Sequence, residues 1–182
     1  MQCNLCDISI GCLFNPGKGQ GARGQVVVIL PSITNSQYNK GFITGKSVRV
    51  LRDNLQQSAF NYYITSLVKC PTSLVRDFEV NNCKQHLIKE LYDINPKVII
   101  TIGDLVTSQF IKYKYFKQVV NKASIIQLNN RTTIIYPLYS ERNKEINIVE
   151  EYTKAFIDLE KIYKAFVNSN YLTLRMLWHD LN

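Results

Sequence analysis

The sequence predicts a single α/β domain, a three-layer α/β/α sandwich around a central, mostly parallel four-stranded sheet. Three observations predict this fold class. The chain of 182 residues is long enough for one domain with a sizeable core, short continuous apolar runs recur along it, and segments with helical periodicity separate these runs. Continuous apolar runs are typical of strands that are buried on both faces, as in a parallel sheet covered by helices. Alternation of strands and helices favours this architecture.

The first half of the chain contains two expected strands and one expected helix. Residues 11–24 are rich in glycine, which indicates a loop. The continuous apolar run within 25–30 predicts the first strand, and 62–68 predicts the second. Between them, residues 46–58 have apolar side chains at helical spacing and predict a helix.

The second half continues the alternation. The expected elements are a helix from 77 to about 92, a strand at 96–103, a helix at 104–112, strands at 125–128 and 132–136, and a helix at 145–168. Asp77 is the expected N-cap of the first of these helices, and Asn129-Asn130 is the expected turn between the last two strands.

Composition restricts the setting and the partners. The net charge is +8 and the isoelectric point is near 9.2, which favours a polyanionic partner such as nucleic acid. The alternative is that the excess positive charge serves only solubility. The chain has no apolar run long enough to predict a membrane span, and Met1-Gln2-Cys3 does not begin a signal peptide. A reducing cytoplasm is therefore the expected compartment.

Four cysteines form the most informative pattern in the sequence. Cys3 and Cys6 make a C-x-x-C, and Cys70 and Cys83 follow about sixty residues later, around an expected passage from strand to helix. Their thiolates suit an iron–sulfur cluster or tetrahedral zinc, while a disulfide framework and four unconnected thiols are the alternatives. Cys12, the fifth cysteine, is expected to be a thiol without a role.

The order of these pieces resembles the iron–sulfur uracil-DNA glycosylases, often called family 4, within the uracil-DNA glycosylase superfamily. The resemblance covers roughly residues 3–165. The pieces that resemble family motifs are the C-x-x-C with its Gly-rich stretch, Gly41-Phe42-Ile43-Thr44-Gly45, Ile64-Thr65-Ser66-Leu67-Val68-Lys69-Cys70, and Pro96-Lys97-Val98-Ile99-Ile100-Thr101-Ile102-Gly103. The resemblance implies a structural [4Fe–4S] cluster on Cys3, Cys6, Cys70 and Cys83, with zinc as the second choice.

The residues at the family's catalytic positions differ from the family pattern. The turn after the first strand, 30–34, has no acid. Ile43 stands where the family has a stacking aromatic (Phe42 if the register slips by one), Ser66 where it has the base-reading asparagine, and Ser140 where it has the histidine. Loss of these groups would remove electrostatic stabilisation and base readout together. The sequence thus predicts a scaffold that has kept its fold and lost its catalysis.

The expected function is a non-catalytic DNA-binding accessory protein of DNA replication, with single-stranded DNA as the expected ligand. Basic residues are expected to contact phosphates, and 111–117 interleaves lysines with aromatics, a composition suited to single strands, although an ordinary helix end is the alternative. The candidate DNA-binding residues are Lys40, Lys46, Arg49, Arg52, Lys112, Lys114, Arg142 and Lys144. One alternative is an active glycosylase on uracil or another altered base, using Asn35, Asp104 or Glu141. Another is a metal-based redox sensor with no role on DNA.

Residues 168–182 are expected to form an apolar tail beyond a domain at 1–167. Leu174, Leu177 and Trp178 either pack back on the domain or dock on a partner. By analogy with members of the superfamily that work with polymerases, a DNA polymerase, possibly of family A, is the expected partner.

Overall fold

The structure is a computed structural model that describes residues 20–21, 24–34, 36–39, 42–58 and 60–168. Its main sheet has six strands in the order β1-β5-β2-β6-β8-β7. These are β1 (Gln20–Gly21), β2 (Val26–Leu30), β5 (Tyr62–Ser66), β6 (Val98–Ile102), β7 (Ser124–Leu128) and β8 (Arg131–Leu138). The remaining elements are β3 (Tyr38–Asn39) paired with β4 (Phe42–Ile43), and α2 (Lys46–Gln57), α3 (Asp77–Ile94), α4 (Asp104–Thr107), the short 3₁₀ helix η1 (Phe116–Gln118) and α5 (Ile148–Asn168).

The predicted fold class is confirmed. Strands β5, β2, β6 and β8 are parallel neighbours and form the four-stranded centre of the sheet. Two antiparallel edge strands, β1 and β7, extend it to six. The predicted turn at Asn129-Asn130 joins β7 to β8, and both residues have positive φ, 50° and 59°. Two asparagines suit a hairpin turn that needs this backbone conformation.

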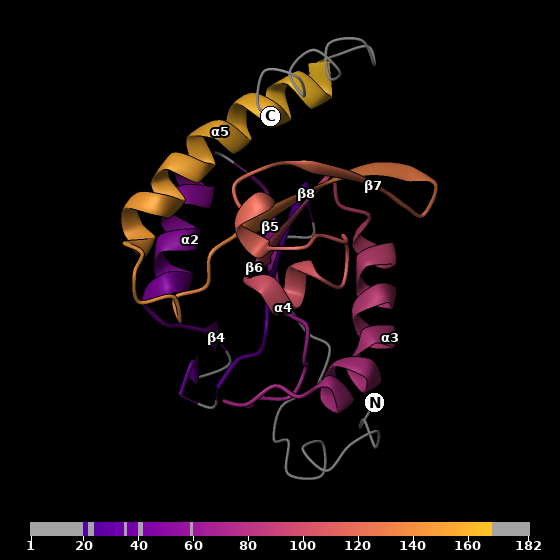
Figure 1. The fold of residues 1–182 in the computed structure, drawn as a ribbon. Helices are drawn as coiled ribbons and strands as arrows, with labels where there is room; N and C mark the ends of the chain where they lie inside the picture. Colours follow the sequence, from indigo (N-terminus) through magenta and orange to yellow (C-terminus); the bar gives the residue numbers. More distant parts are fainter. Residues whose placement is uncertain (1–19, 22–23, 35, 40–41, 59, 169–182) are drawn as a thin grey trace.

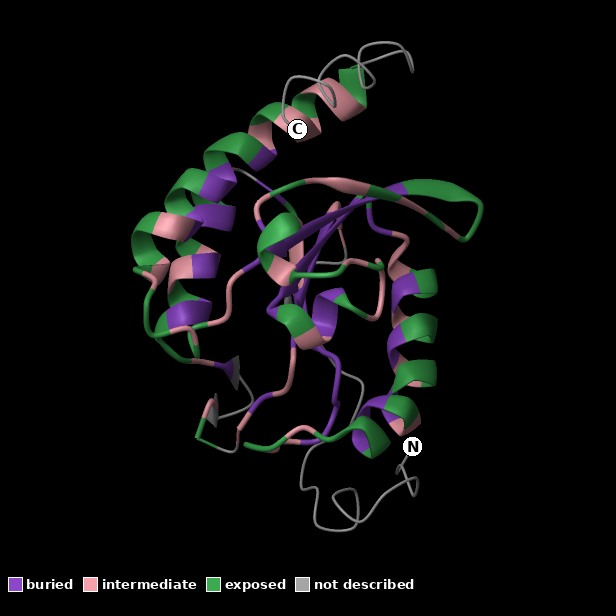
Figure 2. Cartoon of the chain, in the orientation of Figure 1, coloured by how far each residue is buried: buried purple, intermediate pink, exposed green. Residues whose placement is uncertain are grey.

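Helices cover both faces of the sheet, as Figure 1 shows: α2 and α5 lie on one side and α3 on the other. Alternate residues of β2 serve the two cores. Val26 and Val28 pack in the core beneath α2 and α5, whereas Val27 and Ile29 pack in the core beneath α3. All four are fully buried, and Figure 2 shows buried residues concentrated between the layers. Among the described residues, no helix combines the length and apolarity that crossing a membrane requires.

Several helix ends differ from the sequence-based expectation. Helix α5 begins at Ile148, three residues after the expected start at 145. Asp77 is already helical, and Arg76 occupies the N-cap position of α3. The backbone N–H of Arg76 donates to the Glu79 carboxylate at 2.8 Å, so the carboxylate at the third helical position satisfies the N–H of the N-cap residue, as the N3 residue of a capping box does.

Helix α4 ends at Thr107, far short of the expected 112. The Thr107 hydroxyl donates to the carbonyl of Gly103 at 2.9 Å and lies 2.8 Å from the hydroxyl of Thr101. Beyond it, backbone bonds change to the three-residue spacing, with Phe110 N–H donating to the Thr107 carbonyl at 3.0 Å. Side-chain competition for backbone groups and this tighter spacing end the α-helix early.

A buried ion pair fastens α3 to the sheet. The Lys69 ammonium lies 2.5 Å from the Glu90 carboxylate, and the two side chains are only 2% and 9% exposed. Glu90 also accepts bonds from the hydroxyls of Tyr63 and Thr65, each at 2.8 Å. Burial lowers the pKa of Lys69 from its ordinary value, and the charge of Glu90 opposes that shift. The buried Lys69 charge therefore depends on the Glu90 carboxylate as its counter-charge.

Glu90→Ala should destabilise the domain by about 3–5 kcal/mol, because it leaves the Lys69 ammonium buried without its counter-charge. Chemical denaturation monitored by circular dichroism measures this loss. The matched control is Glu150→Ala, which removes an exposed helical ion pair with Lys154 and should change stability little. Equal effects of the two substitutions would contradict the role given to the buried pair.

Candidate functional site

The carboxyl ends of three parallel strands surround a cavity of about 100 Å³. Strands β2, β6 and β8 end at the same edge of the sheet because they are parallel, and the first turn of α2 closes the side. The edge of an open α/β sheet where the carboxyl ends meet is the usual place for a ligand. The cavity is lined by Leu30, Pro31, Ser32, Thr34, Gln37, Ser47, Val48, Ile102, Ser140, Glu141 and Arg142.

Hydrogen bonds hold the loops around the cavity in place. The N–H of Thr72 donates to the carbonyl of Ile33 at 2.7 Å, and the Ser32 hydroxyl donates to the carbonyl of Thr72 at 2.9 Å. These bonds join the loop after β2 to the loop after β5. The site is therefore built from loops that support one another across the sheet edge.

Gly103 lets the end of β6 approach the loop after β8. Its N–H donates to the Leu138 carbonyl at 2.8 Å, and its φ is 84°. A Cβ at this position would lie 3.2 Å from the Cβ of Ser140. Both the backbone conformation and the close contact favour glycine.

The cavity has a mixed lining, in which hydroxyl, amide and charged side chains outnumber the apolar ones. Among its described lining residues Glu141 is the only carboxylate, and there is neither a histidine nor an asparagine. Arg142 is partly engaged, since its guanidinium donates to the carbonyl of Ser73 at 3.0 Å. The arrangement can hold a small polar molecule by neutral hydrogen bonds, with Glu141 as the one lining group able to accept a proton.

The positions singled out by resemblance fall in three places. Ser140 and the turn at 31–34 contribute to the lining. Ile43 is 2% exposed and belongs to the core beneath α2 and α5. The Ser66 hydroxyl donates to the carbonyl of Val68 at 2.8 Å, and Ser66 is not among the lining residues. Asn35 lies outside the described residues.

Sequence reasoning missed Ser47 and Gln37 as lining residues. The Gln37 side chain accepts a bond from the N–H of Thr34 at 2.9 Å, which fastens the loop after β2. Ser47 did carry a signal for a lining position, because it is the second residue of a helix that begins after Gly45. Gln37 carries no comparable signal, because its place depends on how the loop folds back.

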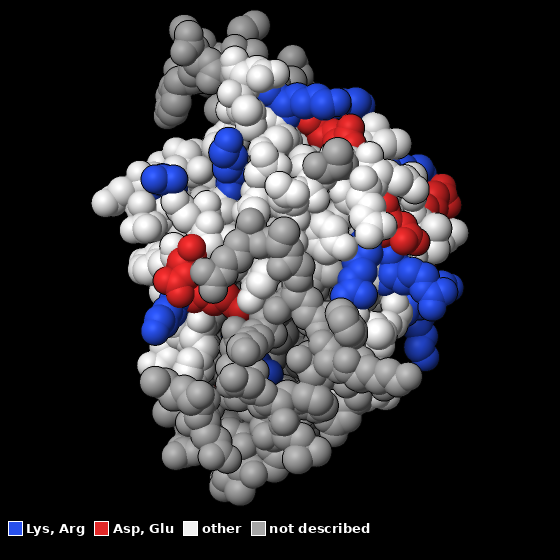
Figure 3. Space-filling model, turned by 180° about the vertical axis from the view of Figure 1, so that it is seen from behind, with Lys and Arg blue, Asp and Glu red and all other residues white. Residues whose placement is uncertain are grey.

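Several predicted DNA-binding residues lie near this edge of the sheet. Lys46 and Arg49 are exposed on the first turns of α2, and Arg52 is half-buried. Figure 3 shows Lys and Arg side chains on the side on which α2 lies, with Asp and Glu side chains beside them. Arg142 lines the cavity, and the exposed Lys144 follows it closely. Lys40 lies outside the described residues.

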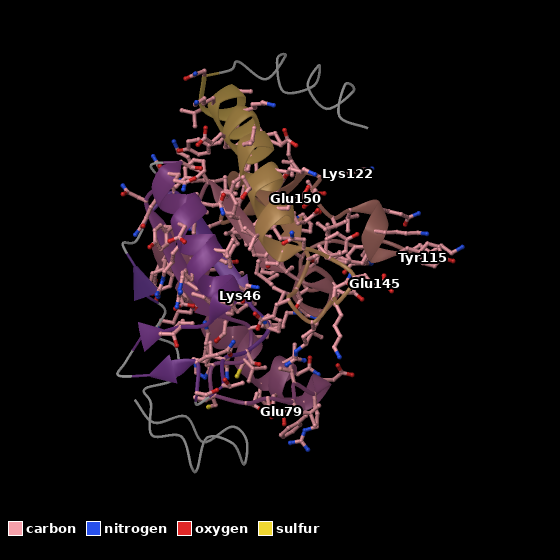
Figure 4. The ribbon with its side chains drawn as sticks, turned by 90° about the vertical axis from the view of Figure 1, so that its left-hand side faces the viewer. Lys46, Glu79, Tyr115, Lys122, Glu145 and Glu150 are labelled. Carbon is pink, nitrogen blue, oxygen red and sulfur yellow. The ribbon has the colours of Figure 1, made fainter. Side chains whose placement is uncertain are left out.

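The lysine and aromatic segment at 111–117 is also held beside this edge. The Tyr113 hydroxyl donates to the Asp104 carboxylate at 2.5 Å and to its backbone carbonyl at 2.9 Å. Burial, with the Asp104 bond, raises the pKa of Tyr113 above its ordinary value. The ring of Phe116 packs edge-on against Tyr139, with centroids 5.6 Å apart. Lys112 and Lys114 are exposed, and in Figure 4 Tyr115 lies at the periphery of the protein.

Two of the four candidate metal ligands lie in the described part. Cys70 and Cys83 are buried, and the backbone N–H of Lys69 donates to the Cys83 sulfur at 3.4 Å. Cys83 Sγ therefore lies beside the chain that leads into Cys70. An N–H donor on a buried sulfur fits a cysteine ligand of an iron–sulfur cluster. Cys3, Cys6 and Cys12 lie outside the described residues, and within the described ranges no group of three metal-ligating side chains occurs.

The tail residues Leu174, Leu177 and Trp178 also lie outside the described residues, so their docking stays a prediction.

Comparison with known proteins places this geometry in a family. A family model described as the uracil DNA glycosylase superfamily matches residues 17–159, a span that contains the whole lining of the cavity. A comparison with curated proteins gave no match. Because the matched span is most of the chain and includes the sheet and the candidate site, the chain belongs to the uracil-DNA glycosylase superfamily.

Proposed function

We propose that this chain is a DNA-binding member of the superfamily that no longer excises bases and that serves DNA replication as an accessory protein of a DNA polymerase. One observation carries the proposal. The cavity stands at the carboxyl edge of the parallel strands, yet its described lining has serines, a threonine and a glutamine as its neutral polar groups. By the family resemblance, an acid in the first turn, an asparagine and a histidine would be expected at this site.

The altered lining bears directly on catalysis. Glycosylases must take the base out of the stack, read its polar edge and stabilise the departing base. Positioned charged or strongly polar donors supply that stabilisation, each normally worth several kcal/mol. Ser140 in the histidine position offers only a neutral hydroxyl, and Ser66 spends its hydroxyl on the Val68 carbonyl. Binding of DNA can outlast such a loss, because backbone contacts come from other residues.

The basic residues around the cavity support DNA binding. Lys46 and Arg49 project from the start of α2, and Arg142 and Lys144 follow β8, so positive side chains flank the cavity on two sides. Lys112 and Lys114 add charge on the segment beside α4. Such charges bind phosphates without reading sequence.

We also propose that Cys3, Cys6, Cys70 and Cys83 hold a structural [4Fe–4S] cluster, with zinc as the runner-up. The burial of Cys70 and Cys83 and the N–H donor on Cys83 support the assignment. The group would supply a cross-link between the N-terminal C-x-x-C and the junction of β5 with α3. With such a cluster, the protein would belong to the iron–sulfur subtype called family 4.

The proposal of a polymerase partner rests on the composition of the tail, residues 168–182. Leu174, Leu177 and Trp178 are an apolar set in a short segment after α5, and apolar anchors with a tryptophan are typical of docking segments. A family A polymerase is the first partner to test.

One observation favours a second function, an active glycosylase on uracil or another altered base. Glu141 lines the cavity and carries the only carboxylate among its described lining residues. A carboxylate at that place can position or activate a water. The two functions differ in whether any base is released.

On single- and double-stranded DNA that contains uracil, the protein should release no base above the uncatalysed rate, because the electrostatic groups are replaced by hydroxyls. Release of free base, separated by chromatography, measures this. Glu141→Ala is the discriminating variant: robust excision by the parent protein that disappears in this variant would establish the second function instead.

DNA affinity should fall steeply with salt, by roughly 0.7 log units per contacted phosphate for each log unit of salt on single strands. Reversing Lys46, Arg49 and Arg142 to Glu should weaken binding for all sequences alike and reduce the salt slope by roughly 2. Fluorescence anisotropy over a salt series measures both quantities.

Two controls accompany the charge reversals. Lys84, Lys89 and Lys97 are exposed on or beside α3, so reversing them changes the net charge equally and should cost little affinity. Truncation after Asn168 should keep DNA binding and abolish copurification with a polymerase. Equal losses of DNA affinity from both reversal sets would show that net charge, and not these positions, determines binding. A truncation that unfolds the domain would show that the tail packs in the core.

Protein purified without oxygen should be brown and contain iron that is lost on Cys70→Ser or Cys83→Ser, because these thiolates are proposed ligands. Metal analysis and visible absorption measure the cluster. Cys12→Ser is the matched control and should retain the iron. A colourless protein with bound zinc would select the runner-up, and a folded protein without metal would contradict both.

A further inference from the structure

The segment at 111–117 has two kinds of aromatic side chain. Tyr113 and Phe116 turn toward the protein: Tyr113 is bonded to Asp104, and Phe116 packs against Tyr139. The two rings also contact each other, with centroids 6.1 Å apart. They act as anchors that hold the segment.

Tyr115 turns outward from this held segment. Its side chain is among the exposed large hydrophobic groups, at 53%, whereas its backbone N–H donates to the Gln118 side chain at 3.1 Å. The ammonium of Lys114 lies 5.3 Å from the centroid of its ring. A single exposed aromatic is ordinary in itself; Tyr115 is distinguished by its fixed backbone and by the lysine beside its ring.

The chain segment that carries Tyr115 is rich in lysine, and the Asp104 carboxylate near it accepts the bond of the Tyr113 hydroxyl. Lys112, Lys114 and Lys117 are all exposed within two or three residues of it, and no acidic side chain occurs in 105–140. Tyr139, which packs on the anchor Phe116, directly precedes Ser140 in the lining of the cavity. The outward ring therefore stands on a basic strip that begins at the edge of the candidate site.

We propose that Tyr115 is a stacking platform for an unpaired base of single-stranded DNA, with Lys112, Lys114 and Lys117 on the neighbouring phosphates. Within a duplex, away from its ends, each base has both faces covered by its neighbours, so a ring on the protein surface meets open base faces mainly in a single strand. Aromatic stacking with lysines on the backbone is the arrangement that sequence-tolerant single-strand binders use. This inference rests on the proposed DNA binding and adds the residue that makes it selective for single strands.

The test compares affinities for an oligothymidylate and for a duplex of equal length. Tyr115→Ala should weaken binding of the single strand by roughly five- to 150-fold, as loss of one stacked base does, and leave duplex binding unchanged. Tyr115→Trp keeps an aromatic ring and should therefore bind the single strand like the parent protein, and the fluorescence of the added tryptophan should be quenched on binding. Tyr92→Ala is the matched control, because Tyr92 is a comparably exposed tyrosine on α3; it should change neither affinity.

The outcomes separate the two proposals. If the parent protein binds neither DNA, the proposed function and this inference both fail. If the parent binds and Tyr115→Ala binds the single strand equally well, the stacking platform alone is overturned. An equal loss of affinity for the single strand and the duplex would also overturn it, because removing a contact with an unpaired base should not weaken duplex binding.

Discussion

The burial of the four parallel strands on both faces is the constraint on which the rest of the structure depends. Strands β2 and β6 are buried along their whole length, so they leave no room for polar side chains except where they end. Because the strands are parallel, those ends meet at one edge, and the loops that follow them carry Ser32, Ser140 and Glu141 to a common cavity. The location of the site is thus a consequence of strand direction, and only its chemistry is left to the loops.

The strands and the long helices could be predicted from the sequence because their signals are local. The apolar run that became β2 and the Asn129-Asn130 turn each depend on neighbouring residues only. The early end of α4 was missed because it depends on Thr107 bonding back to Gly103 and meeting Thr101 on the adjacent strand. Gln37 was missed as a lining residue for the same reason: its place follows from the fold of a loop and not from periodicity. The roles of residues outside the described ranges, such as metal ligation by Cys3 and Cys6, remain predictions.

The Lys69–Glu90 pair connects the sheet to the proposed cluster ligands. Lys69 holds Glu90 of α3 with its side chain and donates its backbone N–H to Cys83 of the same helix. Burying both charges is unfavourable in itself, and the pair is retained with bonds from Tyr63 and Thr65 that satisfy the carboxylate. One residue therefore ties α3 to the chain that follows β5, next to Cys70 in the sequence and in contact with Cys83.

Membership of the superfamily accounts for the sheet, the edge and the cavity, but it does not determine what the cavity does. By the resemblance, the positions that would differ from the family pattern are those that act on a base, whereas Gly103 lies against Ser140 where the loops after β6 and β8 meet. The basic side chains on α2, after β8 and around Tyr115 lie outside the buried layers, where substitution costs little stability. Surface charge and exposed rings can therefore be adapted to a DNA ligand independently of the cavity, so the proposed loss of catalysis does not require the loss of DNA binding.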